Sequence, residues 1–251
     1  MFAHRGGSAL GPENTLAAFE RGIRAGADGL ELDVRLSADG VPVVHHDATL
    51  DRTTSASGPV VARTAADLAR VDAGYRFTRS GDFPFRGQGV GIPSLGDVLR
   101  ACPDVPVIVE MKVDSREMGE AVALVVRAAA AADRVCAAGF GAQSAAAARA
   151  ALPEMACSAS RSEARLAVYR ALAGWPVRRA RYGAYQVPER TSLIRVVTPR
   201  FVRYAHEADV KVQVWTVDDE ADMRRLLSWG VDGLISDRPD LAVAVRDACC
   251  P

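Results

Sequence analysis

Short apolar segments alternate with helical patterns along the whole chain, and this alternation restricts the fold more than any other feature. Eight segments have the composition of buried strands, at residues 2–4, 29–34, 107–112, 135–140, 156–159, 183–187, 210–216 and 233–236. Helical patterns lie between them at residues 14–25, 94–100, 116–132, 142–152, 162–172, 200–207, 221–229 and 240–248. Strands that alternate with helices form a parallel sheet covered by those helices. The sequence therefore predicts an α/β fold, with its weakest strand signals in residues 153–190.

A repeated frame favours a closed barrel of such units. Residues 26–33 and 230–237 share one spacing, in which a helix-ending glycine is followed by a turn and a strand. Where the second copy has Ile235 facing the interior, the first has Glu31, so we expect the frame to be structural and the glutamate to be functional. A length of 251 residues is common for one α/β barrel. We predict a single TIM-type (β/α)8 barrel domain over residues 1–251.

Two segments do not fit the barrel repeat. Residues 41–46 are strand-like but follow the second strand after a short turn at 37–40. A parallel neighbour needs a crossover of roughly a dozen residues or more, so we predict a hairpin excursion. Residues 51–93 are rich in turn-forming residues and have one helical patch near 65–71. We predict that they form a small insertion after the second barrel strand, at the rim where substrate loops lie.

The composition argues against several classes of protein. A hydrophobic content of 49% is enough for a large core, and a net charge of zero predicts no nucleic-acid partner. No apolar run approaches the roughly 20 residues that span a bilayer, so no stable membrane insertion is expected. Five cysteines without C-x-x-C spacing, and no signal peptide before the first strand, favour a cytoplasmic protein, or a secreted one if a signal was removed. The oligomeric state stays open.

Two strands carry charged side chains where aliphatic ones would be expected. Glu31 and Asp33 are two residues apart and so share one face of their strand, as do Glu110 and Lys112 on the next barrel strand. Burying such carboxylates is costly unless a cation or a donor compensates. Lysine occurs in this chain only at positions 112 and 211, so Lys112 at the end of a buried strand indicates a specific role.

The active site of such a barrel lies at the carboxyl ends of its strands, which here bring the acids together with two histidines, an arginine and a lysine. Like charges about 5 Å apart repel by roughly 3 kcal/mol at an effective dielectric constant near 20. A cluster of three carboxylates therefore needs a cation, and oxygen ligands favour Mg²⁺ or Ca²⁺ over zinc. The alternative is that each carboxylate pairs with an arginine.

Six short motifs in order along the chain resemble the glycerophosphodiester phosphodiesterase family. They are His4-Arg5-Gly6-Gly7 with Pro12-Glu13-Asn14-Thr15, Glu31-x-Asp33, His46-Asp47-x-Thr49-Leu50-x-Arg52-Thr53-Thr54, Glu110-x-Lys112, Trp215-Thr216-Val217, and Asp232-Gly233-Leu234-Ile235-Ser236-Asp237-x-Pro239-Asp240. The chain departs from the family pattern at His45, where an apolar residue is usual, and at Asp218, where Asn is frequent. Residues 135–200 carry no distinctive family motif.

The resemblance implies a metal-dependent hydrolase that converts glycerophosphodiesters to glycerol 3-phosphate and an alcohol. It implies one divalent cation held by Glu31, Asp33 and Glu110, with His4 and His46 as the acid/base pair. It also suggests that the glycerol 2-hydroxyl attacks first and gives a cyclic phosphate. Which histidine acts first as base is left open.

Elementary chemistry agrees with this reading. Attack on a phosphodiester places extra negative charge on the non-bridging oxygens, which a cation together with Arg5 and Lys112 would stabilise. Histidine can donate or accept a proton near neutral pH. We expect Trp215, at a strand end, to form a wall of the pocket. Adjacent side chains on an extended strand face opposite ways, so His46 is expected to face the site and His45 to face away.

For several nearby polar residues a structural role is at least as well supported as a catalytic or metal-binding one. Asn14 fits the N-cap of the helix that follows it, and Glu13 is expected in a loop or cap rather than on a metal. Asp237, before Pro239, is read as a helix start. His206 is expected at the surface.

The sequence is also compatible with two other functions. A lysophospholipase D or phospholipid head-group lyase could use the same barrel and metal, and the aromatic residues within 75–93 are compatible with a lipid substrate. A non-catalytic phosphate-binding barrel is the other alternative, although the retained histidines and carboxylates speak against it.

Overall fold

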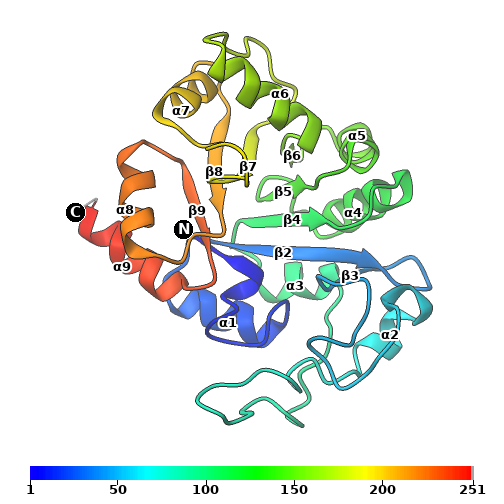
Figure 1. The fold of residues 1–251 in the computed structure, drawn as a ribbon. Coiled ribbons are helices and arrows are strands. Elements are labelled where there is room, and N and C mark those ends of the chain that lie inside the picture. The colour runs from blue at the N-terminus through cyan, green and yellow to red at the C-terminus, as the bar shows by residue number, and fades with distance from the viewer. Residues whose placement is uncertain (250–251) are drawn as a thin grey trace.

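The computed structural model describes residues 1–249 and shows a nearly closed parallel barrel with helices around its outside (Figure 1). The barrel strands are β1 (Phe2–Ala3), β2 (Gly29–Leu36), β4 (Val107–Met111), β5 (Val135–Ala138), β6 (Ala156–Cys157), β7 (Ala184–Pro188), β8 (Lys211–Trp215) and β9 (Gly233–Ser236). They are paired in parallel in the order β6-β5-β4-β2-β1-β9-β8-β7. A bridge between Ser158 and Ala184 joins the two ends of this order. The predicted TIM-type barrel is confirmed.

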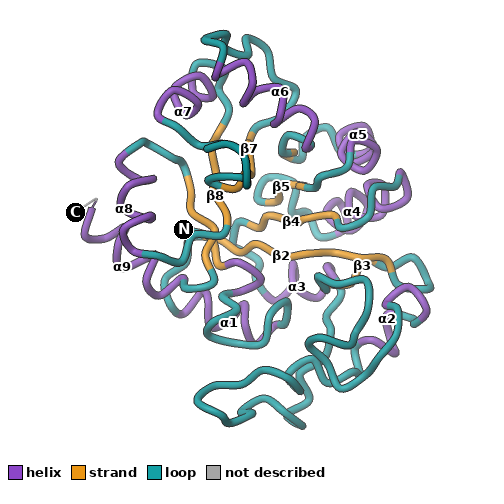
Figure 2. Tube along the Cα trace, in the orientation of Figure 1, coloured by secondary structure: helices purple, strands orange, loops and turns teal. Residues whose placement is uncertain are grey.

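Helices pack against the outside of the strands (Figure 2). They are α1 (Leu16–Arg24), α3 (Leu95–Ala101), α4 (Arg116–Ala128), α5 (Ala142–Ala151), α6 (Arg161–Leu172), α7 (Pro199–His206), α8 (Glu220–Ser228) and α9 (Pro239–Cys249), while the short α2 (Ala65–Leu68) lies in the insertion. Most begin after a Ser, Thr or Asp whose side chain accepts a hydrogen bond from the third following backbone N–H, as at Thr15, Ser94, Ser115, Ser160, Thr198 and Asp219. These caps explain where the helical patterns start.

The hairpin and the insertion also lie where the sequence places them. Strand β3 (Pro42–Val44) pairs antiparallel with β2, which extends to Leu36 because β3 continues its hydrogen bonding beyond the barrel. The segment that follows has a core of its own, in which Val43, Leu50, Leu68 and other apolar side chains are buried. It contains α2 and extends away from the barrel as a long loop before α3 (Figure 1).

The two copies of the repeated frame adopt the same local structure. Gly26 and Gly230 end their helices with φ values of 89° and 82°, a conformation that is strained for residues with a side chain. In each copy the strand that follows pairs with β1, so Gly29 and Ile235 both lie beside Phe2. No helix within residues 1–249 is both long enough and apolar enough to cross a membrane.

The core is divided between the outside and the inside of the barrel. Apolar side chains between the strands and the helices form two large clusters, one around β2 and β4 and one around β7, β8 and β9. Inside the barrel a small cluster contains Ile108, Ala138 and Ile235, with Phe2 and Trp215 packed against it. This apolar layer supports the polar site at the carboxyl ends of the strands.

Candidate active site

Three carboxylates meet at the carboxyl ends of the neighbouring strands β2 and β4. Asp33 lies beside Glu110 in the parallel register, one layer above the pair formed by Glu31 and Ile108. Glu31 and Asp33 are buried and Glu110 is partly exposed. Each can contribute one oxygen to a group in which all ligand atoms lie within 4.8 Å of one another. The period-2 geometry of the strands therefore produces the predicted carboxylate trio.

Two cationic side chains compensate part of this negative charge. Lys112 Nζ lies 2.7 Å from Glu110 Oε1 and 3.3 Å from Asp33 Oδ1. Arg5 Nε lies 3.2 Å from Asp33 Oδ2. Burial raises the pKa of Asp33, but the charges of Lys112 and Arg5 outweigh this effect and the pKa is lowered. Asp33 is therefore ionised at neutral pH.

Glu31 is the least compensated member of the trio. Its Oε2 accepts a hydrogen bond of 3.1 Å from the Arg5 backbone N–H and lies 3.9 Å from His4 Nε2. Among residues 1–249 no lysine or arginine side chain pairs with it. Burial and the charge of Asp33 raise the pKa of Glu31 to about 8. A largely buried all-oxygen site in which one carboxylate lacks a lysine or arginine partner fits a hard divalent cation such as Mg²⁺ or Ca²⁺.

His4 is held in place by a carboxylate from the far end of the chain. It begins a 3-10 turn directly after β1, and its Nδ1 lies 2.6 Å from Asp237 Oδ1. Because a carboxylate only accepts hydrogen bonds, Nδ1 carries the proton and Nε2 faces Glu31 and the cavity. Burial lowers the pKa of His4, but the hydrogen bond to Asp237 and the charge of Glu31 have a larger, opposite effect. The pKa of His4 is therefore raised above its ordinary value. A helix does begin at Pro239, as predicted, but the Asp237 side chain also holds His4.

The turn after His4 needs glycine at its third position. Gly6 has a φ of 87°, and a Cβ atom there would lie 2.8 Å from backbone and side-chain atoms of Ala18 and Phe19 on α1. This close approach lets α1 support the turn that carries His4 and Arg5.

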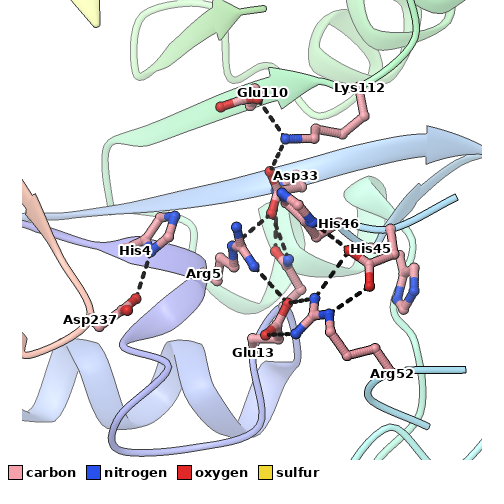
Figure 3. A network of polar contacts seen from close by, with 12 residues as sticks. His4, Arg5, Glu13, Asp33, His45, His46, Arg52, Glu110, Lys112 and Asp237 are labelled. Atoms are coloured by element: carbon pink, nitrogen blue, oxygen red, sulfur yellow. Dashed lines mark hydrogen bonds and ion pairs between the residues drawn. The ribbon is translucent and has the colours of Figure 1, made fainter. Parts of the chain in front are cut away.

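The two adjacent histidines after β3 face opposite ways, as expected (Figure 3). His46 lines the cavity, and its Nδ1 lies 2.6 Å from Asp47 Oδ1. His45 is buried, and its Nε2 lies 3.0 Å from the backbone oxygen of Thr49. Burial lowers the pKa of His45, so its imidazole is neutral at pH 7. The predicted orientation of the two side chains is confirmed.

A second layer of charges supports the site from the loops. Arg52 donates to both carboxylate oxygens of Glu13, at 2.7 and 2.8 Å, and also to Asp47 (Figure 3). Glu13 in turn accepts from Arg5 Nη1 at 2.9 Å. Burial raises the pKa of Glu13, but the hydrogen bonds from Arg52 and the charge of Arg5 lower it overall. Glu13 therefore lies outside the trio and orients Arg5.

Asn14 has a different role from the one that its position indicated. The helix cap is Thr15, whose side chain accepts from the backbone N–H of Ala18. Asn14 donates from Nδ2 to Asp33 at 2.8 Å, and its Oδ1 accepts from the Asp33 backbone N–H at 3.1 Å. It therefore orients a carboxylate of the trio. His206 is exposed, as expected, and pairs with Asp232 away from the site.

One cavity of about 180 Å³ contains every side chain that the sequence singled out for the site. Its lining includes His4, Arg5, Glu31, Asp33, His46, Glu110, Lys112 and Trp215. Phe140, which the sequence reasoning missed, also lines it and packs edge-on against Trp215 with ring centroids 6.0 Å apart. The carboxylates behind the histidines were missed as well, although Asp47 and Asp237 lie within quoted motifs. Two imidazoles, each hydrogen-bonded to a carboxylate, thus share a cavity with a group of carboxylate oxygens that could hold a cation.

Comparisons with known proteins agree with this geometry. A family model described as "Glycerophosphoryl diester phosphodiesterase family" matches residues 4–241. A protein of Caldanaerobacter subterraneus named "Glycerophosphodiester phosphodiesterase" is 33% identical over 250 residues, covering 97% of this chain and 96% of that protein. A crystal structure of a glycerophosphodiester phosphodiesterase from Agrobacterium tumefaciens superposes with a TM-score of 0.77 and 29% identity, covering 98% of each chain.

A further similar structure contains a bound product. It is a phosphodiesterase of Oleispira antarctica in complex with sn-glycerol-3-phosphate, with a TM-score of 0.77 and 25% identity, covering 98% of this chain and 96% of that one. The similarity extends over the whole barrel in both structures.

Proposed function

This chain belongs to the glycerophosphoryl diester phosphodiesterase family, and from that membership we propose how its residues hydrolyse a glycerophosphodiester. The products are glycerol 3-phosphate and the alcohol that was esterified to it. The observation that carries the proposal is the single cavity in which the carboxylate trio, two carboxylate-bonded imidazoles, Arg5 and Lys112 converge. The whole chain acts as one catalytic domain, in which the insertion of about residues 51–93 contributes Arg52 to the charges that support the site.

Glu31, Asp33 and Glu110 hold one divalent cation, Mg²⁺ or Ca²⁺. When bound, the cation supplies positive charge for the non-bridging phosphate oxygens and lowers the cost of adding a nucleophile to an anion. The trio suits this role because Glu31 has no lysine or arginine partner within residues 1–249, whereas Asp33 and Glu110 share Lys112.

Arg5 and Lys112 bind the phosphate. Both are partly buried and held by carboxylates, so their positions are set before the substrate arrives. Burial lowers the pKa of Lys112, but the charges of Asp33 and Glu110 raise it overall, so the side chain stays cationic. Preorganised donors of this kind stabilise charge that develops in the transition state.

His4 and His46 move the protons. Each imidazole has Nδ1 against a carboxylate at 2.6 Å, which leaves Nε2 to exchange a proton with the substrate. One takes the proton of the attacking hydroxyl, and the other protonates the departing alkoxide. Asp237 and Asp47 fix the tautomers, and Asp237 stabilises the imidazolium form of His4.

A coupled assay for released glycerol 3-phosphate tests this function. The protein is treated with EDTA, dialysed and assayed on glycerophosphomethanol, glycerophosphocholine and glycerophosphoethanolamine with and without each cation. We expect release that depends on Mg²⁺ or Ca²⁺ and that falls at least 100-fold in Glu31→Gln. Glu120→Gln, on the exposed face of α4, serves as the matched carboxylate control and is expected to retain full activity. Release by the EDTA-treated protein at the full rate would remove the cation from the proposal.

A further inference from the structure

A second and larger cavity opens directly beside the catalytic one. It has a volume of about 380 Å³ and is walled by α6 and by the loop between β7 and α7. The two cavities share the lining residues Glu110, Phe140, Gln186 and Trp215, so they adjoin, and a substrate whose phosphate lay at the trio would have room to extend into this space. Its size falls within the range of about 300–1,000 Å³ that is usual for small-molecule sites.

The lining of this second cavity is mainly apolar. Val168, Val187 and Val196 are buried in its wall, while large apolar side chains at its rim remain in contact with water. Leu193 is 90% exposed and Tyr169 is 55% exposed. An apolar group that entered the cavity would remove part of this surface from water, which favours binding in proportion to the area covered.

The charges at the rim oppose a cationic ligand. Arg161 and Arg165 line the cavity, and neither forms an ion pair with any residue in the range 1–249. The guanidinium of Arg161 lies 4.7 Å from the ring centroid of Phe140, so a quaternary ammonium at this ring would meet a cation that is already there. Glu110, the carboxylate in the lining, is held by Lys112 at 2.7 Å.

We propose that this cavity is the leaving-group subsite and that the chain prefers glycerophosphodiesters whose alcohol is uncharged and apolar, such as an alkyl or acylglycerol alcohol, over those with a cationic head group. The inference rests on the proposed function. The reaction is the same: the attacking hydroxyl oxygen, of water or of the glycerol, bonds to phosphorus and gives up its proton to one histidine. The P–O bond to the alcohol breaks, and the alcohol leaves with a proton from the other histidine; a cyclic phosphate formed by the glycerol hydroxyl is then opened by water. The cavity determines which alcohol leaves.

A series of glycerophosphodiesters of methanol, butanol and hexanol tests the apolar contribution, because these alcohols have similar intrinsic leaving-group reactivity. Full burial of a methylene gives roughly a fourfold gain, and half burial roughly a twofold gain. The kcat/KM for the hexyl ester should therefore exceed that for the methyl ester by about 30-fold over five added methylenes. Leu193→Ser should reduce this ratio at least threefold. Leu124→Ser is the matched control, since Leu124 is an exposed leucine of α4 away from the cavity.

A matched pair of esters tests the charge. Choline and its neutral carbon isostere 3,3-dimethylbutanol have nearly the same shape, and the ammonium makes choline the better leaving group chemically. A higher kcat/KM for the isostere would therefore reflect binding in the cavity rather than leaving-group chemistry. Arg161→Glu should shift the preference toward choline roughly tenfold. Arg116→Glu is the control, because Arg161 and Arg116 are each the first residue of a helix behind a serine cap.

The outcomes separate this inference from the function beneath it. Hydrolysis of the methyl ester with a flat chain-length series, or a wild-type preference for choline, would overturn the apolar subsite and leave the proposed function standing. An equal effect of Arg161→Glu and Arg116→Glu would overturn the role of the rim charge. Failure to hydrolyse any ester with either cation would reject the proposed function and this inference with it.

Discussion

Replacing each of the four histidines with alanine separates catalysis from stability in this barrel. His46 lines the cavity, and a general acid or base typically contributes 10²- to 10⁴-fold to the rate. His46→Ala should therefore lower kcat by about that factor while the fold remains intact. His4→Ala should do the same, because its Nε2 faces the carboxylate trio from the other side.

His45→Ala should show the opposite pattern. Its imidazole is 5% exposed and bonded to the Thr49 backbone oxygen at 3.0 Å. The change removes a buried side chain and a partly buried hydrogen bond, which together cost about 1–3 kcal/mol. In a chain of this size each kcal/mol lowers the Tm by roughly 2–4 °C, so a decrease of about 2–12 °C is expected. The change in kcat should be less than about tenfold, because no proton-transfer group is lost.

The assay is steady-state glycerol 3-phosphate release on the best diester, with thermal unfolding followed by circular dichroism. His206→Ala is the control, since His206 is exposed and bonded to Asp232 outside the site. Its Tm should change by less than that of His45→Ala, and its kcat should not change. A greater loss of kcat at His45 than at His46 would contradict the assignment of the acid/base pair.

Three further changes test the electrostatics of the site. Mg²⁺ or Ca²⁺ at about 100 times its Kd should add roughly 2.7 kcal/mol to the free energy of unfolding of the EDTA-treated protein. Glu110→Gln should lose much of this gain. A variant that keeps all of it would show that the carboxylate trio is not the cation site. Asp237→Asn should lower kcat about 10- to 100-fold. Because Asp237 raises the pKa of His4, the limb of the pH–rate profile that reports His4 should also move to lower pH. An unchanged limb would show that Asp237 does not act through His4. Arg52→Ala should cost about 1–2 kcal/mol at pH 7 in denaturant unfolding, allowing for the half-exposed guanidinium. Arg52 helps to lower the pKa of Glu13 and of Asp47 below their ordinary values of 4.5 and 3.8. This stabilisation is therefore fully present above those values and falls as the pH drops through the two lowered pKa values. A difference that does not shrink between pH 7 and pH 2 would have another origin.

Features that depend on local periodicity could be read from the amino-acid sequence. The alternation of strands and helices predicts the barrel, and the spacing of Glu31 and Asp33 places both on the inner face of β2. The opposite orientations of His45 and His46 follow from the same period. The hairpin of β3 follows from the short turn before it, because a parallel partner needs a long crossover. Most of the cavity lining was therefore predictable.

Contacts between segments that are distant along the chain were decided only by the tertiary structure. The Asp237 carboxylate reaches His4 across 233 positions because β1 and β9 are neighbours in the closed barrel. Asn14 turns to Asp33 because Thr15 already caps α1. The apolar cavity beside Phe140 is lined mainly by residues 138–196, which carry no family motif and include the weak strand signals of 153–190. The alternation of side chains along a strand determines which face of the sheet a side chain occupies. The residue that the side chain contacts depends on how the barrel closes and on how the loops pack above it.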